Sequence, residues 1–106
     1  MSYRYMRLLI FFDLPITTLE NKRNYRRFHN ELIKHGFIML QESVYCRLCI
    51  NEAALHLLEN QVESFKPPGG NIMAMHVTEK QFTEIKLISG SMETDVIHST
   101  DRTIIL

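Results

Sequence analysis

The sequence contains no long apolar run, and this excludes a membrane-spanning helix as one of its elements. No apolar stretch reaches the ~20 residues that a membrane span needs. Only two cysteines occur among 106 residues, too few for the disulfide framework of many small secreted domains. The N-terminal region also has no small-residue cleavage site of the kind that ends a signal peptide. We therefore expect a reduced, cytoplasmic protein that does not use a membrane.

Several common catalytic and ligand-binding motifs are also missing. There is no Walker loop, no Rossmann glycine pattern and no G-x-S-x-G. The five histidines are spread along the chain without the spacing of metal ligands. Cys46 and Cys49 have C-x-x-C spacing, but they fall within an expected strand, where the two thiols point to opposite faces. A zinc site would need a second ligand pair, so a structural role is predicted for the cysteines and histidines.

The formal net charge is zero, which argues against a protein that simply coats nucleic acid. The charge is nevertheless polarised. Residues 1–50 hold eight Lys and Arg against four acids, a difference of +4, and residues 51–106 hold four against eight, a difference of −4. Such a chain can offer one face to phosphate and another to a basic protein. Chance segregation of surface charge is the alternative.

Hydrophobic periodicity predicts six elements in the order β-α-β-β-α-β. The first strand, residues 5–12, is apolar on both faces and is therefore expected at the centre of a covered sheet. A helix follows over 17–35, two strands over 37–40 and 43–50, a helix from about 52 to the break at 66–70, and a strand over 71–78. This order predicts an α+β fold of the ferredoxin-like kind, with both helices on one face of a four-stranded antiparallel sheet.

Local signals mark the ends of both helices. Thr17 and Glu20 have the spacing of a capping box, and Gly36 is the expected left-handed residue after the first helix. Asn51 is the expected N-cap of the second helix. We expect residues 1–78 to form the core of a single domain, which at this length is small enough to gain from burial against a partner.

About 28 residues follow this core, more than the fold needs. Residues 82–88 are expected to form an extra short strand, and 103–106 a final apolar strand. We interpret residues 79–106 as an extension that pairs with a second protomer or another protein at a sheet edge. A tail that folds back with no partner is the alternative.

Asp13 is the leading candidate for chemistry, because it is a single acid that closes an apolar strand just before Leu14-Pro15. An acid at the rim of a core needs compensation, for which a cation is the usual choice. One carboxylate binds Mg²⁺ poorly, but two copies that face each other across a symmetry axis could hold the ion and a phosphodiester. The same position also suits a residue that only favours the start of the next helix.

Basic side chains cluster on one side of the first helix, opposite the apolar stripe of Tyr25, Phe28 and Leu32. They are Lys22, Arg23, Arg26, Arg27 and Lys34. Arg and Lys bind phosphate whatever the base sequence, so this side predicts contact with a nucleic-acid backbone. A solvated helix face is the alternative.

Taken together, these segments resemble the small CRISPR-associated endonuclease that partners the CRISPR integrase in spacer acquisition, the second Cas protein family. The resemblance rests on residues 7–15 (RLLIFFDLP), 25–28 (YRRF), 36–45 (GFIMLQESVY), 70–72 (GNI) and 77–82 (VTEKQF). It covers nearly the whole chain, and the opening MSYRYMR is similar to the variety found with type II-A systems.

The resemblance implies a homodimer of ferredoxin-like protomers in which the C-terminal strand of each adds to the other's sheet. It implies that Asp13 is the Mg²⁺ ligand and catalytic residue, one from each protomer, and that Ser43 lies near the dimer axis, where it touches metal, water or phosphate. It further implies that the dimer bridges two integrase dimers, with a double-stranded DNA prespacer running across it.

Three functional hypotheses follow. The first is a duplex-binding bridge in the integration complex, with a metal-dependent endonuclease site. The second is a free-standing Mg²⁺-dependent endoribonuclease or DNase. The third is a small-molecule-binding regulatory domain, because ferredoxin-like units host many functions, although no glycine turn directed at a ligand supports it.

Overall fold

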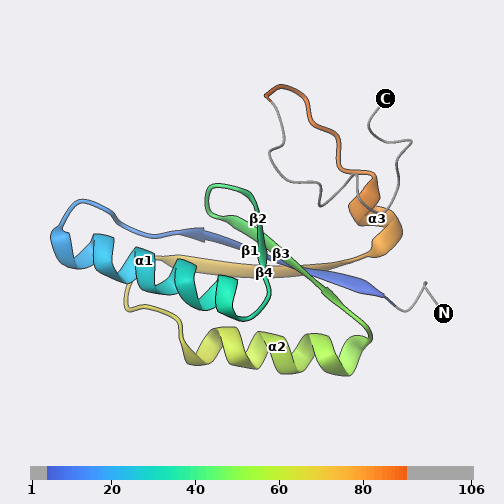
Figure 1. Cartoon of the computed structure of the whole chain (residues 1–106), viewed down its shortest axis with the longest axis horizontal. Helices are drawn as coiled ribbons and strands as arrows, with labels where there is room; N and C mark the ends of the chain where they lie inside the picture. The colour runs from blue at the N-terminus through green and yellow to red at the C-terminus, as the bar shows by residue number, and fades with distance from the viewer. Residues whose placement is uncertain (1–4, 91–106) are drawn as a thin grey trace.

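A computed structural model of the chain describes residues 5–90. Its elements are β1 (Met6–Asp13), α1 (Leu19–Lys34), β2 (Ile38–Gln41), β3 (Val44–Cys49), α2 (Glu52–Ser64), β4 (Asn71–Thr78) and α3 (Glu79–Thr83). The four strands form one antiparallel sheet in the order β2-β3-β1-β4, and α1 and α2 lie on the same side of it (Figure 1). This arrangement confirms the predicted ferredoxin-like α+β fold. Between residues 5 and 90, no helix has the length and apolar character that a membrane crossing requires.

The main core fills the space between the sheet and these two helices. Leu8, Ile10 and Phe12 alternate along β1 on this side and are almost fully buried. They pack with Phe28 of α1 and Leu55 of α2, and with the other members of the same cluster. The predicted apolar stripe of α1 is therefore confirmed, and β1 is the central strand that its sequence indicates. The second helix, α2, likewise turns Leu55, Leu58 and Val62 toward this core.

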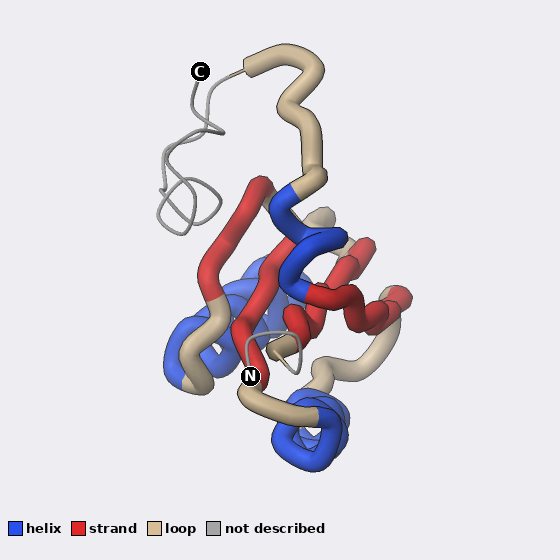
Figure 2. The backbone as a smooth tube through the Cα atoms, turned by 90° about the vertical axis from the view of Figure 1, so that its right-hand side faces the viewer, coloured by secondary structure: helices blue, strands red, loops and turns tan. Residues whose placement is uncertain are grey.

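A smaller core lies on the other side of the sheet. It consists of Leu9, Cys46 and Phe82, all buried. Phe82 belongs to α3, which Figure 2 shows on the side of the sheet away from α1 and α2. Cys46 lies in this core and Cys49 in the main one, so the two thiols do lie on opposite faces, and both are free.

The predicted strand over 82–88 is wrong. Residues Glu79–Thr83 form α3, and residues 84–88 form no strand. The cause is a complete capping box: the Thr78 hydroxyl accepts from the Gln81 backbone N–H at 3.1 Å, and the Gln81 side chain accepts from the Thr78 N–H at 2.9 Å. The predicted strand over 103–106 lies outside the described residues.

The capping residue of α1 also differs from the prediction. Thr18, not Thr17, accepts from the Asn21 backbone N–H, at 3.0 Å, and α1 begins at Leu19. Thr17 instead accepts from the Asn21 side chain at 3.4 Å. The C-terminal signal is confirmed, because Gly36 has φ +88°, and so is Asn51, whose side chain accepts from the Ala54 N–H at 2.8 Å.

The side of the sheet opposite α1 and α2 is only partly covered, by α3. Strand alternation and register place four large apolar side chains there that remain between 40% and 65% exposed. They are Ile38, Leu48, Met73 and Met75. We call this surface the open face. Exposed apolar side chains gathered on one side of a sheet are a common feature of interaction surfaces.

Candidate functional site

Asp13 is the last residue of β1, at one end of the open face. It is exposed and lies opposite Asn71 in the register of β1 with β4. Side chains alternate along a strand, so Asp13 stands on the same side of the sheet as Leu9 and Phe11. The side is the one that α1 and α2 leave open, which places this carboxylate beside the exposed apolar residues.

Two backbone contacts fix this end of β1. The Phe12 N–H donates to the Ser43 carbonyl at 3.1 Å, which ties the strand to the turn between β2 and β3. Gly70, with φ +74°, packs so closely that a Cβ there would lie 2.9 Å from the Asp13 carbonyl oxygen and 2.5 Å from Leu14 Cδ2. No side chain fits at position 70 without displacing Asp13 or its neighbour.

Ser43 lies in the β2–β3 turn that contacts the end of β1. Its φ is +70°, in the left-handed region, and its hydroxyl lies 3.2 Å from the Tyr25 hydroxyl. The Phe12 ring packs edge-on against Tyr25, with 5.7 Å between centroids, and stacks on Tyr45 at 5.5 Å. Aromatic packing and two hydrogen bonds therefore connect α1, the β2–β3 turn and the end of β1.

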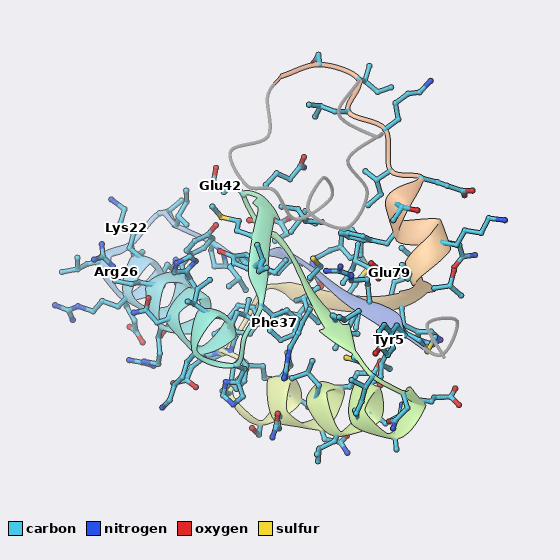
Figure 3. All side chains as sticks on the ribbon, turned by 45° about the vertical axis from the view of Figure 1, so that its right-hand side comes forward. Tyr5, Lys22, Arg26, Phe37, Glu42 and Glu79 are labelled. Carbon is cyan, nitrogen blue, oxygen red and sulfur yellow. The ribbon has the colours of Figure 1, made fainter. Side chains whose placement is uncertain are left out.

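The basic side chains of α1 lie as the sequence predicts. Lys22, Arg23, Arg26, Arg27 and Lys34 are all exposed, and Figure 3 shows Lys22 and Arg26 projecting away from the sheet. Within the described part of the chain none of the five makes an ion pair. We call this surface the basic face. Its charges are available to a polyanion.

A carboxylate oxygen is the kind of ligand that Mg²⁺ prefers, so the donor chemistry of Asp13 fits this ion. The number of such donors that one chain places near Asp13 does not fit a metal site. Among residues 5–90 there is no group of three or more His, Cys, Asp or Glu side chains placed to hold a metal. A site at Asp13 would therefore need a further carboxylate from outside residues 5–90 of this protomer.

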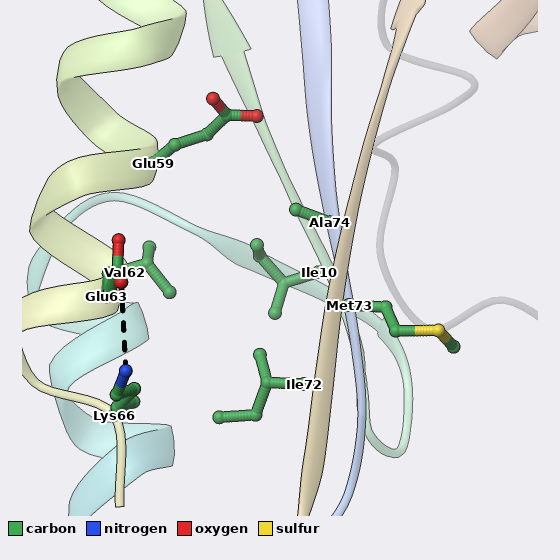
Figure 4. A pocket seen from close by; sticks show the side chains of 8 residues that line it. All are labelled: Ile10, Glu59, Val62, Glu63, Lys66, Ile72, Met73 and Ala74. Carbon is green, nitrogen blue, oxygen red and sulfur yellow. Dashed lines mark ion pairs between the residues drawn. The ribbon is translucent and has the colours of Figure 1, made fainter.

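Two hollows lie near the sheet. One, of about 650 Å³, runs between α1 and the β2–β3 turn and is lined by Tyr25, Arg26, His29, Asn30, Met39, Glu42 and Tyr45. The other, of about 310 Å³, lies between α2 and β4, with the Glu63–Lys66 ion pair on its wall (Figure 4). Only the first includes a predicted site residue, Arg26. Neither is lined by Asp13.

The first hollow has a buried phenol in its wall. The Tyr45 hydroxyl is hydrogen-bonded to His29 Nδ1. Burial, together with the neighbouring Tyr25 and Glu42, raises the pKa of Tyr45 to about 12. This phenol therefore stays protonated at neutral pH and acts as a hydrogen-bonding group, not as a base.

Arg7 is an ordered ion-pairing residue whose partner the sequence reasoning missed. Its guanidinium is buried on the α3 side of the sheet, 4.4 Å from the centre of the Phe82 ring, and it donates to both Glu79 carboxylate oxygens, at 2.8 and 3.0 Å. Burial alone would lower the pKa of Arg7, but the bonds to Glu79 and its charge outweigh it, so this pKa is raised. The sequence did contain one signal for this ion pair, because Arg7 is the single charged residue within the apolar run 6–12 and a buried charge needs a partner.

Comparison with known proteins identifies the family. The sequence model described as CRISPR associated protein Cas2 matches residues 6–85, from the start of β1 to just beyond α3. The chain belongs to the Cas2 family. The family predicted from the sequence is thereby confirmed.

Curated relatives match almost end to end. A protein of Ligilactobacillus salivarius is 44% identical over 101 residues, which cover 95% of this chain and all of the relative. Proteins of Lacticaseibacillus rhamnosus and Treponema denticola are each 41% identical with the same coverage. All three carry the name CRISPR-associated endoribonuclease Cas2. The roles of Asp13, Ser43 and the basic face stay predictions.

Proposed function

We propose that two copies of this Cas2-family chain pair through the open face to form a Mg²⁺-dependent endonuclease that also binds double-stranded DNA. The observation that carries this proposal is the position of Asp13. It stands on the same side of β1 as Leu9 and Phe11, next to the exposed apolar side chains. Covering that surface with a second copy removes apolar area from water and brings a second Asp13 toward the first.

The size of the open face favours pairing. Met73 is 65% exposed and Met75 49%, both on β4, and Leu48 of β3 and Ile38 of β2 are each about two fifths exposed. A domain of this length gains from burying such area in a partner. Residues 85–90 follow α3 with Ile85, Leu87 and Ile88 exposed, which supports a C-terminal segment that pairs with the other protomer.

The chemistry assigned to this site is hydrolysis of a phosphodiester. When bound, Mg²⁺ would polarise the phosphate and lower the pKa of a coordinated water. The residues that would hold it are the two Asp13 carboxylates. The protein chain itself holds each carboxylate at a fixed strand end. The Ser43 carbonyl fixes the backbone on one side, and the close packing of Gly70 fixes it on the other.

The basic face supplies the contact with nucleic acid. Its five cations are exposed and lie along one helix, and they carry no base-reading geometry, so binding should follow phosphate and not sequence. Negative charge is found on the other long helix, α2, which carries Glu52, Glu59 and Glu63. We assign α2 and the acidic C-terminal half to contact with the CRISPR integrase, whose dimers the bridge would join.

The nuclease site is tested by Asp13→Ala. We expect metal-dependent cleavage to be lost, while sedimentation shows the same dimer as the wild type. Glu84→Ala is the matched control, because Glu84 is an exposed acid outside the site and without an ion pair in the described residues. Wild-type cleavage by Asp13→Ala, or a monomer at high concentration for the wild-type chain, would contradict the proposal.

The duplex contact is tested by charge reversal at Arg23, Arg26 and Arg27. We expect weaker binding and a salt dependence whose slope is shallower by ~1 for each phosphate contact removed. Binding with an unchanged slope would exclude the basic face as the contact surface.

A free-standing endoribonuclease is the second candidate, favoured by the name that the relatives carry, CRISPR-associated endoribonuclease Cas2. The two candidate functions are distinguished by comparing cleavage of single-stranded RNA and double-stranded DNA of one sequence. A second experiment measures spacer acquisition in cells that carry the integrase. If Asp13→Ala abolishes cleavage but still supports acquisition, the bridge is the function that the cell uses.

A further inference from the structure

The turn between β2 and β3 contains an unusual backbone conformation. Ser43 is the only non-glycine residue of the described chain with a positive φ, at +70°, whereas the four glycines Gly36, Gly69, Gly70 and Gly90 share this property. Glycine adopts such angles without steric cost, and asparagine adopts them more readily than serine. A serine stays in a conformation suited to glycine only when the surrounding structure holds it there, and such positions cluster at functional sites.

Two hydrogen bonds hold Ser43 there. Its carbonyl accepts from the Phe12 N–H at 3.1 Å, and its hydroxyl lies 3.2 Å from the Tyr25 hydroxyl. The first bond depends on the backbone alone and would survive with glycine at position 43. The second requires the serine side chain. The hydroxyl therefore gives a reason why serine is used in this turn.

Tyr25 is placed to hold this turn from α1. Its ring is half-buried and packs edge-on against Phe12, at 5.7 Å between centroids, so the ring is positioned without its hydroxyl. Among the described residues, the hydrogen-bond partner of that hydroxyl is Ser43. A chain of contacts thus leads from α1 through Tyr25 and Ser43 to Phe12, whose next neighbour is Asp13.

From this geometry we infer that Tyr25 is a positioning residue for Asp13. It holds the Ser43 turn in its left-handed conformation, and the Ser43 carbonyl in turn fixes the backbone directly before the carboxylate. This inference rests on the proposed nuclease function, and it adds a residue that touches neither substrate nor metal. Different measurements test the nuclease function and the positioning role of Tyr25.

The first test uses Tyr25→Phe, which removes one hydroxyl and keeps the ring. Hydrogen exchange of the Phe12 amide should become faster, because its acceptor is less firmly held, while the Leu8 amide earlier on β1 serves as an internal reference. Metal-dependent kcat should fall about five- to ten-fold, the size expected for one neutral hydrogen bond, with KM for the nucleic acid unchanged. Tyr45→Phe is the matched control, since its hydroxyl bonds to His29 and not to Ser43.

The second test uses Ser43 itself. Ser43→Ala should match Tyr25→Phe in kcat, and the double variant should be no slower than either single one, because both remove the same bond. Ser43→Gly should be more stable than Ser43→Ala, because both lack the hydroxyl and only alanine is strained at this φ, yet its kcat should be as low, because its turn has also lost the bond to Tyr25. A gain in stability over Ser43→Ala without a gain in rate distinguishes positioning from a purely structural role.

The outcomes separate the proposals. Loss of cleavage in Asp13→Ala with unchanged kcat and unchanged Phe12 exchange in Tyr25→Phe overturns this inference alone. A fall in kcat without faster Phe12 exchange also overturns it, because Tyr25 would then act on the substrate directly. If Asp13→Ala cleaves normally, the nuclease function fails, and the exchange of the Phe12 amide still shows whether Tyr25 holds the turn.

Discussion

Replacing Glu79 by glutamine should destabilise this domain more than any other change that removes a single surface carboxylate. Glu79 lies at the start of α3 and binds both Nε and Nη2 of Arg7, at 2.8 and 3.0 Å, across 72 positions of sequence. The side chain of Arg7 is 7% exposed and that of Glu79 22%. Glutamine has the same shape but no charge, so a buried guanidinium would lose its counter-ion.

The magnitude follows from burial. Removing one partner of a fully buried ion pair costs ~3–5 kcal/mol, because the remaining charge is left uncompensated. Here Glu79 keeps some contact with water, and the glutamine oxygen still accepts one hydrogen bond from Arg7. We therefore expect a loss of ~2 kcal/mol in the free energy of unfolding, which for a domain of this size lowers the melting temperature by about 8 °C or more.

The assay is thermal and urea unfolding at one fixed protein concentration, since association shifts apparent stability. Glu84→Gln is the control and should change little, because this exposed acid makes no ion pair within the described residues. The variant Arg7→Met/Glu79→Gln should be more stable than Glu79→Gln alone, because it removes the buried charge as well. Equal stability of Glu79→Gln and wild type, or a double variant that shows the sum of two losses, would refute the reasoning.

Three further predictions concern the glycine turn, the cap of α1 and the buried phenol. Gly70→Ala should lower the melting temperature markedly more than Gly69→Ala, because both residues have positive φ but only a Cβ at position 70 meets other atoms. Thr18→Ala should cost ~1 kcal/mol in the free energy of unfolding, and Thr17→Ala less, if Thr18 is the N-cap. The raised pKa of Tyr45, about 12, means that the folded protein keeps this proton where the unfolded chain has lost it. Stability should therefore fall as pH rises from ~10 toward 12, and Tyr45→Phe should fall less over the same window.

Local sequence signals determined most of the secondary structure. The apolar run of β1, the apolar stripe of α1 and the Asn51 cap all depend on residues within a few positions of each other, and each was predicted correctly. The errors were also local. The pair Thr78 and Gln81 has the spacing of a capping box, and this signal, overlooked at the sequence level, makes the segment a helix instead of a strand.

The sequence by itself determined the fold class, the family and the position of Asp13 at the end of the central strand, because these depend on short-range patterns and on matched motifs. Only the tertiary structure joined Arg7 to Glu79, brought Gly70 against Asp13 and set the Tyr25 hydroxyl beside Ser43. Each of these contacts links elements far apart in the chain. Their formation depends on how the sheet and helices pack, and no local propensity encodes that packing.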